Sequence, residues 1–263
     1  MTRPRPTSSP LGEHSDRQTR LRQATRAHYE SFPFIEGGER RVQLWHNRLR
    51  NDLPDRLIAG ARIVDIGSSI GEVAHSLRLR GADMVCVDLT HAALRRNQEL
   101  HPGVRAVQSD ALALPFPDAT FDHAISIGVL HHTADCQLGL SELARVTRPG
   151  GTLMVLLYSR WTLYHLAYLA TAALRRRVPV DRLHQVSGWQ LAVVRTVAGF
   201  LIHQRLNDEQ VRRLVADQFW TPRATFHSPR QVRRWAHAQG LTVIKMHREY
   251  FYSNLFVLKR CAK

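Results

Sequence analysis

Lysine, cysteine and long apolar runs are all scarce in this chain of 263 residues. Only three of its 37 lysine and arginine residues are lysine, namely Lys245, Lys259 and Lys263. Such a skew toward arginine is what a GC-rich genome produces without selection for phosphate binding, and the arginines are spread along the chain. The formal net charge of +15 therefore gives little support to a nucleic-acid partner. Weak association with an anionic membrane surface stays open, because arginines 175–177 adjoin short apolar stretches.

The scarcity of cysteine and of apolar runs also indicates the cellular compartment in which the protein is expected. The three cysteines, Cys86, Cys136 and Cys261, are odd in number and widely separated, which argues against a disulfide framework and against a metal site. The longest apolar stretches, residues 163–174 and 189–202, are shorter than the roughly 20 residues that a transmembrane helix needs. Residues 1–20 lack the apolar core of a signal peptide. We therefore expect a protein of the reducing cytoplasm.

The length allows one substantial core, and only the N-terminus has a biased composition. Residues 1–20 hold prolines, serines and arginines but few large apolar residues, so we expect them to be disordered. Residues 21–54 are expected to form an N-terminal helical cap. Residues 55–263 are expected to form one α/β domain with a helical insertion at residues 159–227.

The most informative stretch of the sequence is residues 62–72. An apolar run leads into Asp65, then into a turn bounded by Gly67 and Gly71, and then into a helical pattern that starts at Glu72. A buried strand, a tight turn and a helix N-terminus in this order make the ligand crevice of an open α/β sheet. The two glycines let the backbone approach a ligand where a Cβ atom would block it.

This turn does not fit the dinucleotide-binding pattern. That pattern, Gly-x-Gly-x-x-Gly, requires glycine where this chain has Ser69 and Glu72, and the carboxylate of Glu72 would lie where the pyrophosphate belongs. An acid two residues before the first glycine instead resembles the first motif of the class I S-adenosylmethionine-dependent methyltransferases, acid-x-Gly-x-Gly-x-Gly. Asp65, Gly67, Ser69 and Gly71 occupy its positions, with serine in place of the middle glycine. An acidic pocket suits a ligand that carries an ammonium and a sulfonium group.

Later blocks extend the resemblance. Further apolar strands are expected over residues 84–88, 104–108, 124–128 and 152–158. The second strand ends in Asp88, 21 residues after Gly67. The order of the blocks resembles the methyltransferase family that includes small-molecule and quinone methyltransferases, densely over residues 62–158 and more loosely over both flanks.

The C-terminal part of the chain predicts an antiparallel hairpin. Strands are expected over residues 241–246 and 255–258, and the link between them is too short for a parallel crossover. Ser228 and Pro229 are typical of a helix start, so a helix is expected over residues 230–239. With five parallel strands before it, the hairpin completes a Rossmann-like, doubly wound sheet of seven strands, which is the sheet of the class I methyltransferases.

The resemblance implies cofactor-binding residues at the strand ends: Asp65, Gly67, Ser69 and Gly71 at the methionine half of S-adenosylmethionine, Asp88 at the ribose, Asp110 with Ala111 at the adenine, and Leu89 on the adenine face. An acid at the place of Asp88 also binds ribose hydroxyls in doubly wound nucleotide sites in general. The two glycines could instead serve only the turn, and Asp110 could merely cap its loop.

His131 and His132 follow the fourth strand, beside the expected position of methyl transfer. Histidine titrates near neutrality and is the commonest general base. Two adjacent histidines cannot both point into one pocket, and either could simply hydrogen-bond a loop. His131 is our candidate for proton transfer. Neither histidine has the spaced carboxylate or thiol partner that a metal site needs.

The segments around these blocks are expected to close the site. Residues 159–227 begin where ligands bind in open α/β sheets, so we interpret them as a lid over the substrate, with residues 217–227 as part of its pocket. A dimer interface or an added helical layer is the alternative. Tyr29, Phe32 and Phe34 resemble the leader of some small-molecule methyltransferases, which folds over the cofactor, or they pack the cap onto the sheet.

These features together predict an enzyme that transfers a methyl group from S-adenosylmethionine to a small organic molecule, such as a specialised metabolite. A lid and a cap suit a closed pocket better than a groove for a polymer. A tRNA or lipid methyltransferase is the alternative if the arginines gather around the pocket mouth. Ser69 also keeps open a protein that binds the cofactor without transferring a methyl group. The sequence leaves the acceptor atom and the oligomeric state open, a homodimer included.

Overall fold

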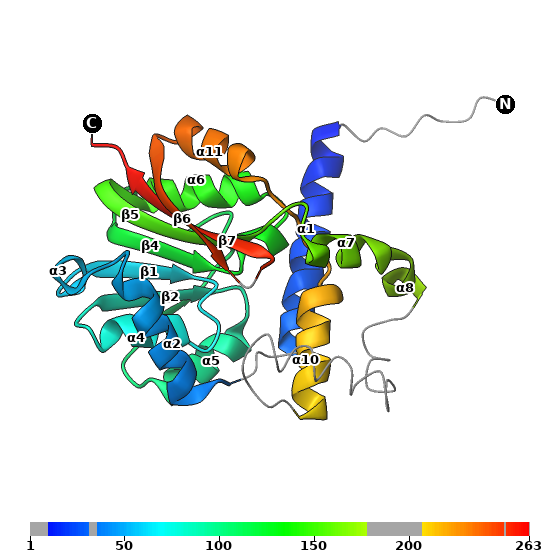
Figure 1. Cartoon of the computed structure of the whole chain (residues 1–263), viewed down its shortest axis with the longest axis horizontal. Coiled ribbons are helices and arrows are strands. Elements are labelled where there is room, and N and C mark those ends of the chain that lie inside the picture. The colour runs from blue at the N-terminus through cyan, green and yellow to red at the C-terminus, as the bar shows by residue number, and fades with distance from the viewer. Residues whose placement is uncertain (1–9, 32–35, 178–206, 250, 263) are drawn as a thin grey trace.

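The computed structural model describes residues 10–31, 36–177, 207–249 and 251–262 of the chain. A seven-stranded sheet lies at its centre, with helices on both faces (Figure 1). The strands are β1 (Arg62–Ile66), β2 (Asp83–Asp88), β3 (Arg105–Gln108), β4 (Phe121–Ile127), β5 (Thr147–Tyr158), β6 (Leu241–Glu249) and β7 (Ser253–Arg260). Their order in the sheet is β3-β2-β1-β4-β5-β7-β6.

Strand β7 runs against the six other strands. β1 pairs in parallel with β2 and β4, β2 with β3, and β4 with β5, whereas β7 pairs antiparallel with both β5 and β6. The chain passes directly from Glu249 at the end of β6 to Ser253 at the start of β7, and so short a link permits only a hairpin. The structure confirms the doubly wound sheet and the C-terminal antiparallel hairpin.

The direction in which the strands are laid down changes at β1. β2 and β3 follow β1 on one side, and the chain then returns to place β4 and β5 on the other side. In open α/β sheets, such a switch point opens a crevice beyond the C-terminal ends of the two central strands. Here those ends lead into Gly67 after β1 and Gly128 after β4.

One face of the sheet is covered by the helices that precede and connect the first three strands. They are α2 (Gly38–Arg50), α3 (Asp55–Ile58), α4 (Glu72–Arg78) and α5 (His91–Leu100). Helix α2 buries Val42, Trp45 and Leu49, which are spaced as one helical face, and packs on α4. Trp45 and Leu49 join Met84 and Leu156 from the sheet in one apolar cluster.

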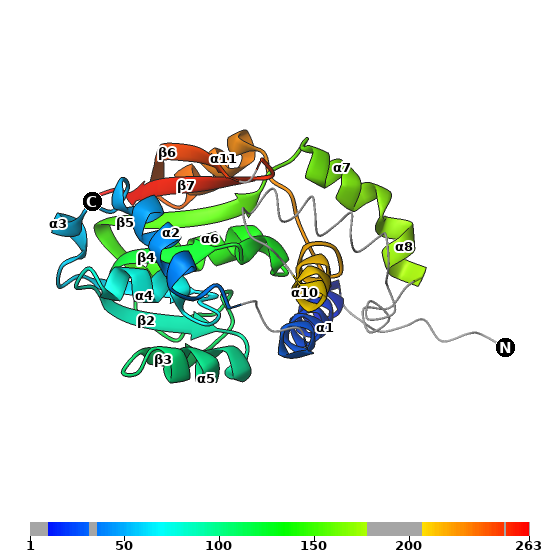
Figure 2. The same ribbon diagram turned by 60° about the horizontal axis from the view of Figure 1, so that its bottom comes forward.

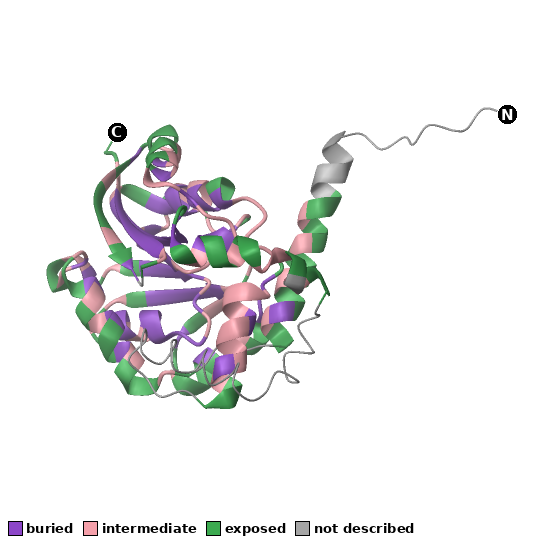
Figure 3. Ribbon diagram, turned by 45° about the vertical axis from the view of Figure 1, so that its right-hand side comes forward, coloured by how far each residue is buried: buried purple, intermediate pink, exposed green. Residues whose placement is uncertain are grey.

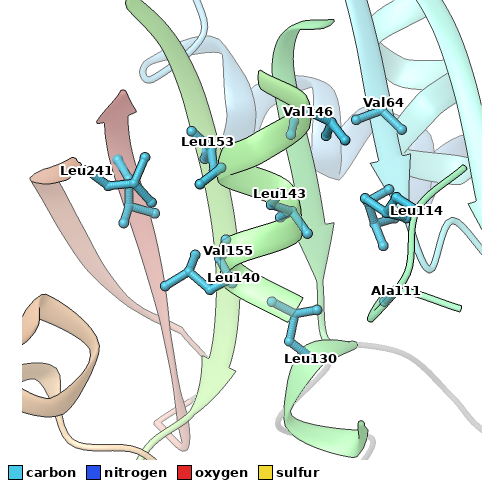
Figure 4. Packing of buried hydrophobic residues seen from close by; sticks show 14 of the residues in the cluster. Val64, Ala111, Leu114, Leu130, Leu140, Leu143, Val146, Leu153, Val155 and Leu241 are labelled. Carbon is cyan, nitrogen blue, oxygen red and sulfur yellow. The ribbon is translucent and has the colours of Figure 1, made fainter. Parts of the chain in front are cut away.

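The opposite face is covered by α6 (Cys136–Val146) and α11 (Pro229–Ala238). Figure 4 shows Leu140 and Leu143 of α6 directed at Leu153 and Val155 of β5. Alternate residues of β5 serve the two faces, since Leu153 and Val155 lie in this cluster while Met154 and Leu156 lie in the other. As predicted, Ser228 caps α11, because its Oγ accepts a hydrogen bond from the amide of Gln231 at 3.2 Å.

A Glu-x-x-Arg pair on α6 binds the backbone of the loop that follows β3. The guanidinium of Arg145 donates to the carbonyl oxygens of Leu114 (3.0 Å) and Phe116 (2.7 Å). Glu142 accepts a hydrogen bond from the amide of Leu114 at 2.8 Å. The loop that follows β3 is therefore fixed by a helix from a later part of the chain.

Four helices lie beyond the ends to which the parallel strands point: α1 (Pro10–Ser31), α7 (Leu163–Ala170), α8 (Ala172–Arg177) and α10 (Asp208–Phe219). Figures 1 and 2 both show α1 and α10 side by side, with α7 and α8 further along the same side of the sheet. Buried residues are concentrated in the strands, and exposed residues in the helices around them (Figure 3). Within the described residues, every helix is too short or too polar to cross a membrane.

The N-terminal flank and the insertion after β5 both contain helices where the structure describes them. Disorder was expected over residues 1–20, but α1 begins at Pro10, so residues 10–20 are helical; residues 1–9 lie outside the described part. Proline suits a first helical position, and the following Glu, Gln, Arg and Ala residues are good helix formers. The insertion at residues 159–227 contains the helices α7, α8 and α10, while the apolar stretch at residues 189–202 lies outside the described residues.

Candidate functional site

The turn after β1 is built from left-handed backbone conformations. Gly67 has φ = 73° and Gly71 has φ = 83°, a region in which a Cβ atom is strained. Ser69 also has a positive φ of 50°. The one non-glycine residue at a glycine position of the motif therefore adopts the conformation that favours glycine.

Both glycines are also required by packing. A Cβ atom on Gly67 would lie 2.2 Å from Cγ2 of Val129, and one on Gly71 would lie 2.1 Å from Oδ1 of Asn97. Val129 follows β4 and Asn97 is a buried residue of α5, so the turn is wedged between two other elements. The glycines thus set the shape of the turn, and any ligand would meet its backbone rather than the space beside their Cα atoms.

Asp65 lies in β1, directly below this turn, and is almost fully buried. Burial, together with the charge of Asp88, raises the pKa of its carboxyl to about 7. Its Oδ2 atom is buried and has no hydrogen-bond partner among the described residues. A carboxyl in this condition is ready to accept hydrogen bonds from a cationic ligand, which would also favour its ionised form.

Asp88 ends β2 and ties the neighbouring turns together. Its Oδ2 accepts a hydrogen bond from the amide of Ser69 at 3.0 Å. Its Oδ1 accepts from the amide (2.9 Å) and the hydroxyl (2.8 Å) of Thr90. Burial nevertheless raises the pKa of Asp88, with these hydrogen bonds acting in the opposite direction. Oδ2 accepts only one of these three hydrogen bonds, so its second lone pair can still accept a hydrogen bond from a ribose hydroxyl.

The remaining cofactor candidates lie beside Asp88 at the neighbouring strand end. The amide of Ser109 donates to the carbonyl oxygen of Asp88 at 3.0 Å, which brings Asp110 and the buried Ala111 to the same edge. Oδ1 of Asp110 accepts from the amide of Leu112 at 2.9 Å, so this side chain does cap its own loop. The carbonyl oxygen of Leu89 accepts from Nε2 of Gln108 at 3.0 Å. All the predicted cofactor residues therefore lie along one edge, over the ends of β1, β2 and β3.

Glu72 lies away from this edge. It is the first residue of α4, and its Oε1 accepts a hydrogen bond from the amide of Gly37 at 2.8 Å, while Oε2 pairs with Arg41 at 2.9 Å. The carboxylate thus serves the contact between α4 and α2. Because the carboxylate of Glu72 is bound to Gly37 and Arg41, it does not occupy the turn after β1.

His131 and His132 form a short 3-10 helix after β4 and have different surroundings. The ring of His131 is fully buried and stacks on the ring of Tyr158, with 3.7 Å between centroids. Burial, with smaller contributions from His132 and His227, holds the pKa of His131 well below its usual value. Its main-chain oxygen accepts hydrogen bonds from the amide and hydroxyl of Thr225, both at 2.9 Å. His131 is therefore packed between the sheet and the segment after α10.

His132 is held with a defined tautomer. Its Nδ1 lies 2.8 Å from the carbonyl oxygen of Arg223, and because a carbonyl can only accept, Nδ1 carries the proton. The lone pair of the neutral ring is then on Nε2. Burial lowers the pKa of His132, while the carboxylate of Asp217 acts to raise it. A neutral histidine with a fixed tautomer and a nearby carboxylate has the properties of a general base.

Two residues from the ends of the chain meet beside His132. The hydroxyl of Tyr29 in α1 donates to Oδ1 of Asp217 in α10 at 3.3 Å, and the ring of Tyr29 faces that of His132 edge-on at 6.3 Å. Sequence reasoning identified Tyr29 in the cap and placed Asp217 at the start of a candidate pocket segment, but it did not pair them. Phe32 and Phe34 lie outside the described residues.

Aromatic rings line the same region beyond the end of β5. The ring of Tyr158 contacts those of Tyr164, Phe226 and Tyr252, with centroids 5.2, 5.6 and 5.7 Å apart. The hydroxyls of Tyr158 and Tyr164 both bond to Gln218, at its Oε1 (3.2 Å) and its main-chain oxygen (2.5 Å). These rings come from β5, from α7, from the segment after α10 and from the turn between β6 and β7, so four parts of the chain build one aromatic wall.

The predicted cofactor residues over the ends of β1, β2 and β3 form what we call the polar edge. This edge suits a ligand with hydroxyl and cationic groups better than it suits a metal ion. Besides Oδ2 of Asp65, the Oγ atom of Ser69 is buried without a hydrogen-bond partner among the described residues. The part of the chain that the structure describes contains no cluster of three histidine, cysteine, aspartate or glutamate side chains able to hold a metal. These orphan polar atoms fit an adenosyl amino acid ligand, which offers an ammonium group and ribose hydroxyls.

Residues 64–155 match the family model described as "Methyltransferase domain". The chain is 35% identical over 138 residues to a demethylmenaquinone methyltransferase of Corynebacterium urealyticum, across 52% of this chain and 58% of that protein. An O-methyltransferase of Aspergillus nomiae is 29% identical over 161 residues, across 57% of this chain and 72% of that protein. The magnesium protoporphyrin IX methyltransferase of Synechocystis PCC 6803, solved with bound SAH, shares the fold, with a TM-score of 0.51 at 14% identity over 96% of this chain and 100% of that one.

The similarity in sequence is confined to part of each relative. The chain spans about half the length of the first curated relatives it matches, 58%, 48% and 52% of three demethylmenaquinone methyltransferases. The matched family model covers the strands from β1 to β5, and with them the predicted cofactor edge and the two histidines. The helices α1, α7, α8 and α10 lie outside the match.

Proposed function

We propose that the protein transfers a methyl group from S-adenosylmethionine to a small organic molecule, because residues 64–155 match the methyltransferase domain model and the whole chain forms the seven-stranded sheet expected of that fold. The observation that carries the proposal is the polar edge over β1, β2 and β3. There the buried, partly unsatisfied carboxyl of Asp65 and the carboxyl of Asp88 flank a turn of left-handed residues. No other described part of the chain combines these features.

In this proposal each residue of the edge has a separate task. Asp65 binds the ammonium group, Asp88 binds the ribose hydroxyls, and the turn from Gly67 through Ser69 to Gly71 carries the backbone past the amino acid half. Asp110, Ala111 and Leu89 surround the adenine. When bound, S-adenosylmethionine supplies an electrophilic methyl group on a sulfonium, and the work of the protein is to hold the acceptor in line with it.

Proton removal from a hydroxyl acceptor requires a base, and the geometry favours His132 over His131 for that role. His131 is fully buried, its ring stacks on Tyr158, and its ring nitrogens have no hydrogen-bond partner among the described residues that would fix a tautomer. His132 presents Nε2 as its acceptor, faces Tyr29 and lies near Asp217. We therefore transfer the proton-accepting role from His131 to its neighbour.

The acceptor is proposed to be a planar molecule with a hydroxyl group. Tyr164, Phe226 and Tyr252 of the aromatic wall are only partly buried, so an aromatic or quinoid acceptor can stack against their rings. The names of the relatives, a demethylmenaquinone methyltransferase and an O-methyltransferase, support the same class. Helices α1, α7 and α10 are proposed to act as cap and lid, excluding water from the reactive sulfonium.

We also propose that the protein works in the cytoplasm. All three cysteines are free, and burial raises the pKa of the Cys86 and Cys136 thiols to about 12, which suits a reducing cytoplasm. A homodimer and weak contact with a membrane surface can be tested by sedimentation and by vesicle binding.

Calorimetry with S-adenosylhomocysteine tests cofactor binding, and transfer of a labelled methyl group to a panel of phenols and quinols tests turnover. We expect saturable binding at one site per chain and labelling of at least one acceptor class. Binding without labelling of any acceptor would favour the cofactor-binding alternative. Absence of binding would reject the proposed function as a whole.

A further inference from the structure

The outer side of α7 is apolar although it faces solvent. Leu163, Leu166 and Leu169 are exposed, Leu163 to 86% of its full area, and Ala167 and Ala170 beside them are exposed as well. The inner side of the helix is already occupied, because Tyr164, His165 and Tyr168 pack around Phe226. A helix that is apolar on all sides is normally buried, and no described part of the chain covers the outer side of α7.

Two large aromatic side chains continue this apolar side. Trp161 is 75% exposed and Phe251 is 78% exposed, and both have a positive φ, 62° and 61°, that L-residues rarely adopt. The amide of Ser159 donates to the carbonyl oxygen of Tyr252 at 2.8 Å, which joins the strand end before Trp161 to the hairpin turn that carries Phe251. The backbone therefore brings these two exposed aromatic residues to the same end of the sheet, where α7 begins.

Arginines without acidic partners border the apolar side chains. Arg160, Arg176 and Arg177 are exposed, and none of them pairs with a carboxylate among the described residues. The sequence from residue 151 to residue 207 has seven arginines and one acidic residue, Asp181. The apolar side of α7 thus lies in a strongly positive part of the chain.

A hollow of about 320 Å³ adjoins the same border. It is lined by Arg160, Ser228, Arg230, Gln231 and Arg234, so it holds three guanidinium groups and no acid. The amide of Arg160 donates to the carbonyl oxygen of His227 at 3.2 Å, which places this arginine-lined hollow directly beside Trp161. Its size and charge suit a phosphate-bearing headgroup.

We propose that Trp161, Phe251, the α7 leucines and the bordering arginines form one docking surface for a bilayer that contains anionic phospholipids. The aromatic rings and leucines enter the interfacial region, and the arginines contact headgroup phosphates. A second copy of the chain fits this surface less well, because a two-fold interface would bring the same unpaired arginines together. The proposal does not depend on methyl transfer, since binding to lipid can be measured alone.

Co-sedimentation of the full chain with vesicles tests the surface. We expect binding to mixed phosphatidylglycerol and phosphatidylcholine vesicles at least about tenfold stronger than binding to pure phosphatidylcholine. Binding should weaken when the salt is raised to about 0.5 M, which screens the arginines. Equal binding to both kinds of vesicle, or no binding to either, would overturn the proposal.

Two variants separate this surface from the rest of the basic protein. Leu163→Ser with Leu166→Ser, and separately Arg176→Gln with Arg177→Gln, should each lower vesicle binding by about fivefold or more while S-adenosylhomocysteine binding and circular dichroism stay unchanged. Leu79→Ser is the matched control, since Leu79 is 66% exposed on another face. If all three variants bind vesicles like the wild type, the surface is not the docking site. A wild-type dimer that the leucine variant dissociates, with unchanged vesicle binding, would assign the surface to a second copy instead.

Discussion

The amide of Ser69 donates a hydrogen bond to Oδ2 of Asp88 at 3.0 Å, so the turn after β1 and the end of β2 form one polar unit. Ser69 makes this contact from a left-handed conformation with φ = 50°. The serine therefore fills the conformational role of the middle glycine in the motif and adds a hydroxyl to it. The departure from the family pattern changes a side chain but keeps the backbone.

Replacing Ser69 with glycine should leave S-adenosylhomocysteine binding unchanged or tighter. Glycine relieves the left-handed strain at this position but gains freedom in the unfolded chain, so the unfolding free energy should change by less than about 1 kcal/mol. Calorimetry and denaturant unfolding measure both. Ser68→Gly is the control and should destabilise, because Ser68 has no positive φ. A large loss of affinity in Ser69→Gly would show that the hydroxyl itself contacts the ligand.

Asp88→Ala should weaken S-adenosylhomocysteine binding by roughly tenfold to a hundredfold, equivalent to about 1.5–3 kcal/mol, because ribose hydroxyls lose a charged acceptor. The matched control is Asp83→Ala, at the exposed first position of the same strand, which should bind normally. Calorimetry on both folded proteins makes the comparison. Unchanged affinity in Asp88→Ala would remove the ribose assignment.

Asp65 should make the protein less stable as the pH rises. Its pKa is raised from 3.8 to about 7 in the folded protein, so the folded state binds the proton more tightly than the unfolded chain does. This contribution is complete below about pH 4 and is lost as the pH rises through about 7, at a cost on the order of 4 kcal/mol at most. Urea unfolding of the wild type and of Asp65→Asn from pH 5 to pH 8 should show a smaller decline in the variant. Parallel curves would contradict the assignment.

His132→Gln should lower turnover of a hydroxyl acceptor by about a hundredfold, because the base is lost while the cofactor edge is intact. S-adenosylhomocysteine binding should stay within about twofold. His131→Gln is the comparison: it should mainly reduce stability, since it changes a ring packed on Tyr158, and turnover per folded molecule should fall far less. If His131→Gln abolishes turnover and His132→Gln does not, the original assignment to His131 is the correct one.

Tyr29 and Asp217 should be energetically coupled. Tyr29→Phe and Asp217→Asn each remove one side of their hydrogen bond, and a double-mutant cycle on unfolding should give a coupling of about 0.5–1.5 kcal/mol. Glu30→Gln, on the same helix, should show no coupling with Asp217→Asn. An additive cycle for the Tyr29 pair would mean that the two helices are held together by other contacts.

The strands and the cofactor edge could be predicted from the sequence because the signals are local. A parallel strand is buried on both faces, so its residues form short apolar runs. Ile63 and Val64 lead into Asp65 and the turn at Gly67, and Met84 to Val87 lead into Asp88. Gly67 and Gly71 mark left-handed positions directly. Where a backbone conformation requires one residue type, that conformation can be predicted from the sequence.

The other parts of the site depend on contacts between distant residues. The orientation of His131 and His132 is set by Arg223 and Thr225, more than ninety positions away, and no local pattern distinguishes two adjacent histidines. The start of α1 at Pro10 gives no periodic signal, because the helix is polar around most of its surface. The pairing of Tyr29 with Asp217 could not be read from either residue alone.

The hydrogen bond between Tyr29 and Asp217 joins positions that are 188 residues apart. A chain that emerges from the ribosome therefore completes β1 to β5, with the polar edge, well before α10 can reach α1. The polar edge can form before the contact between α1 and α10 beside His132 exists. α1 can contact α10 only after residue 217 has been made, so this side of the site is completed late in synthesis.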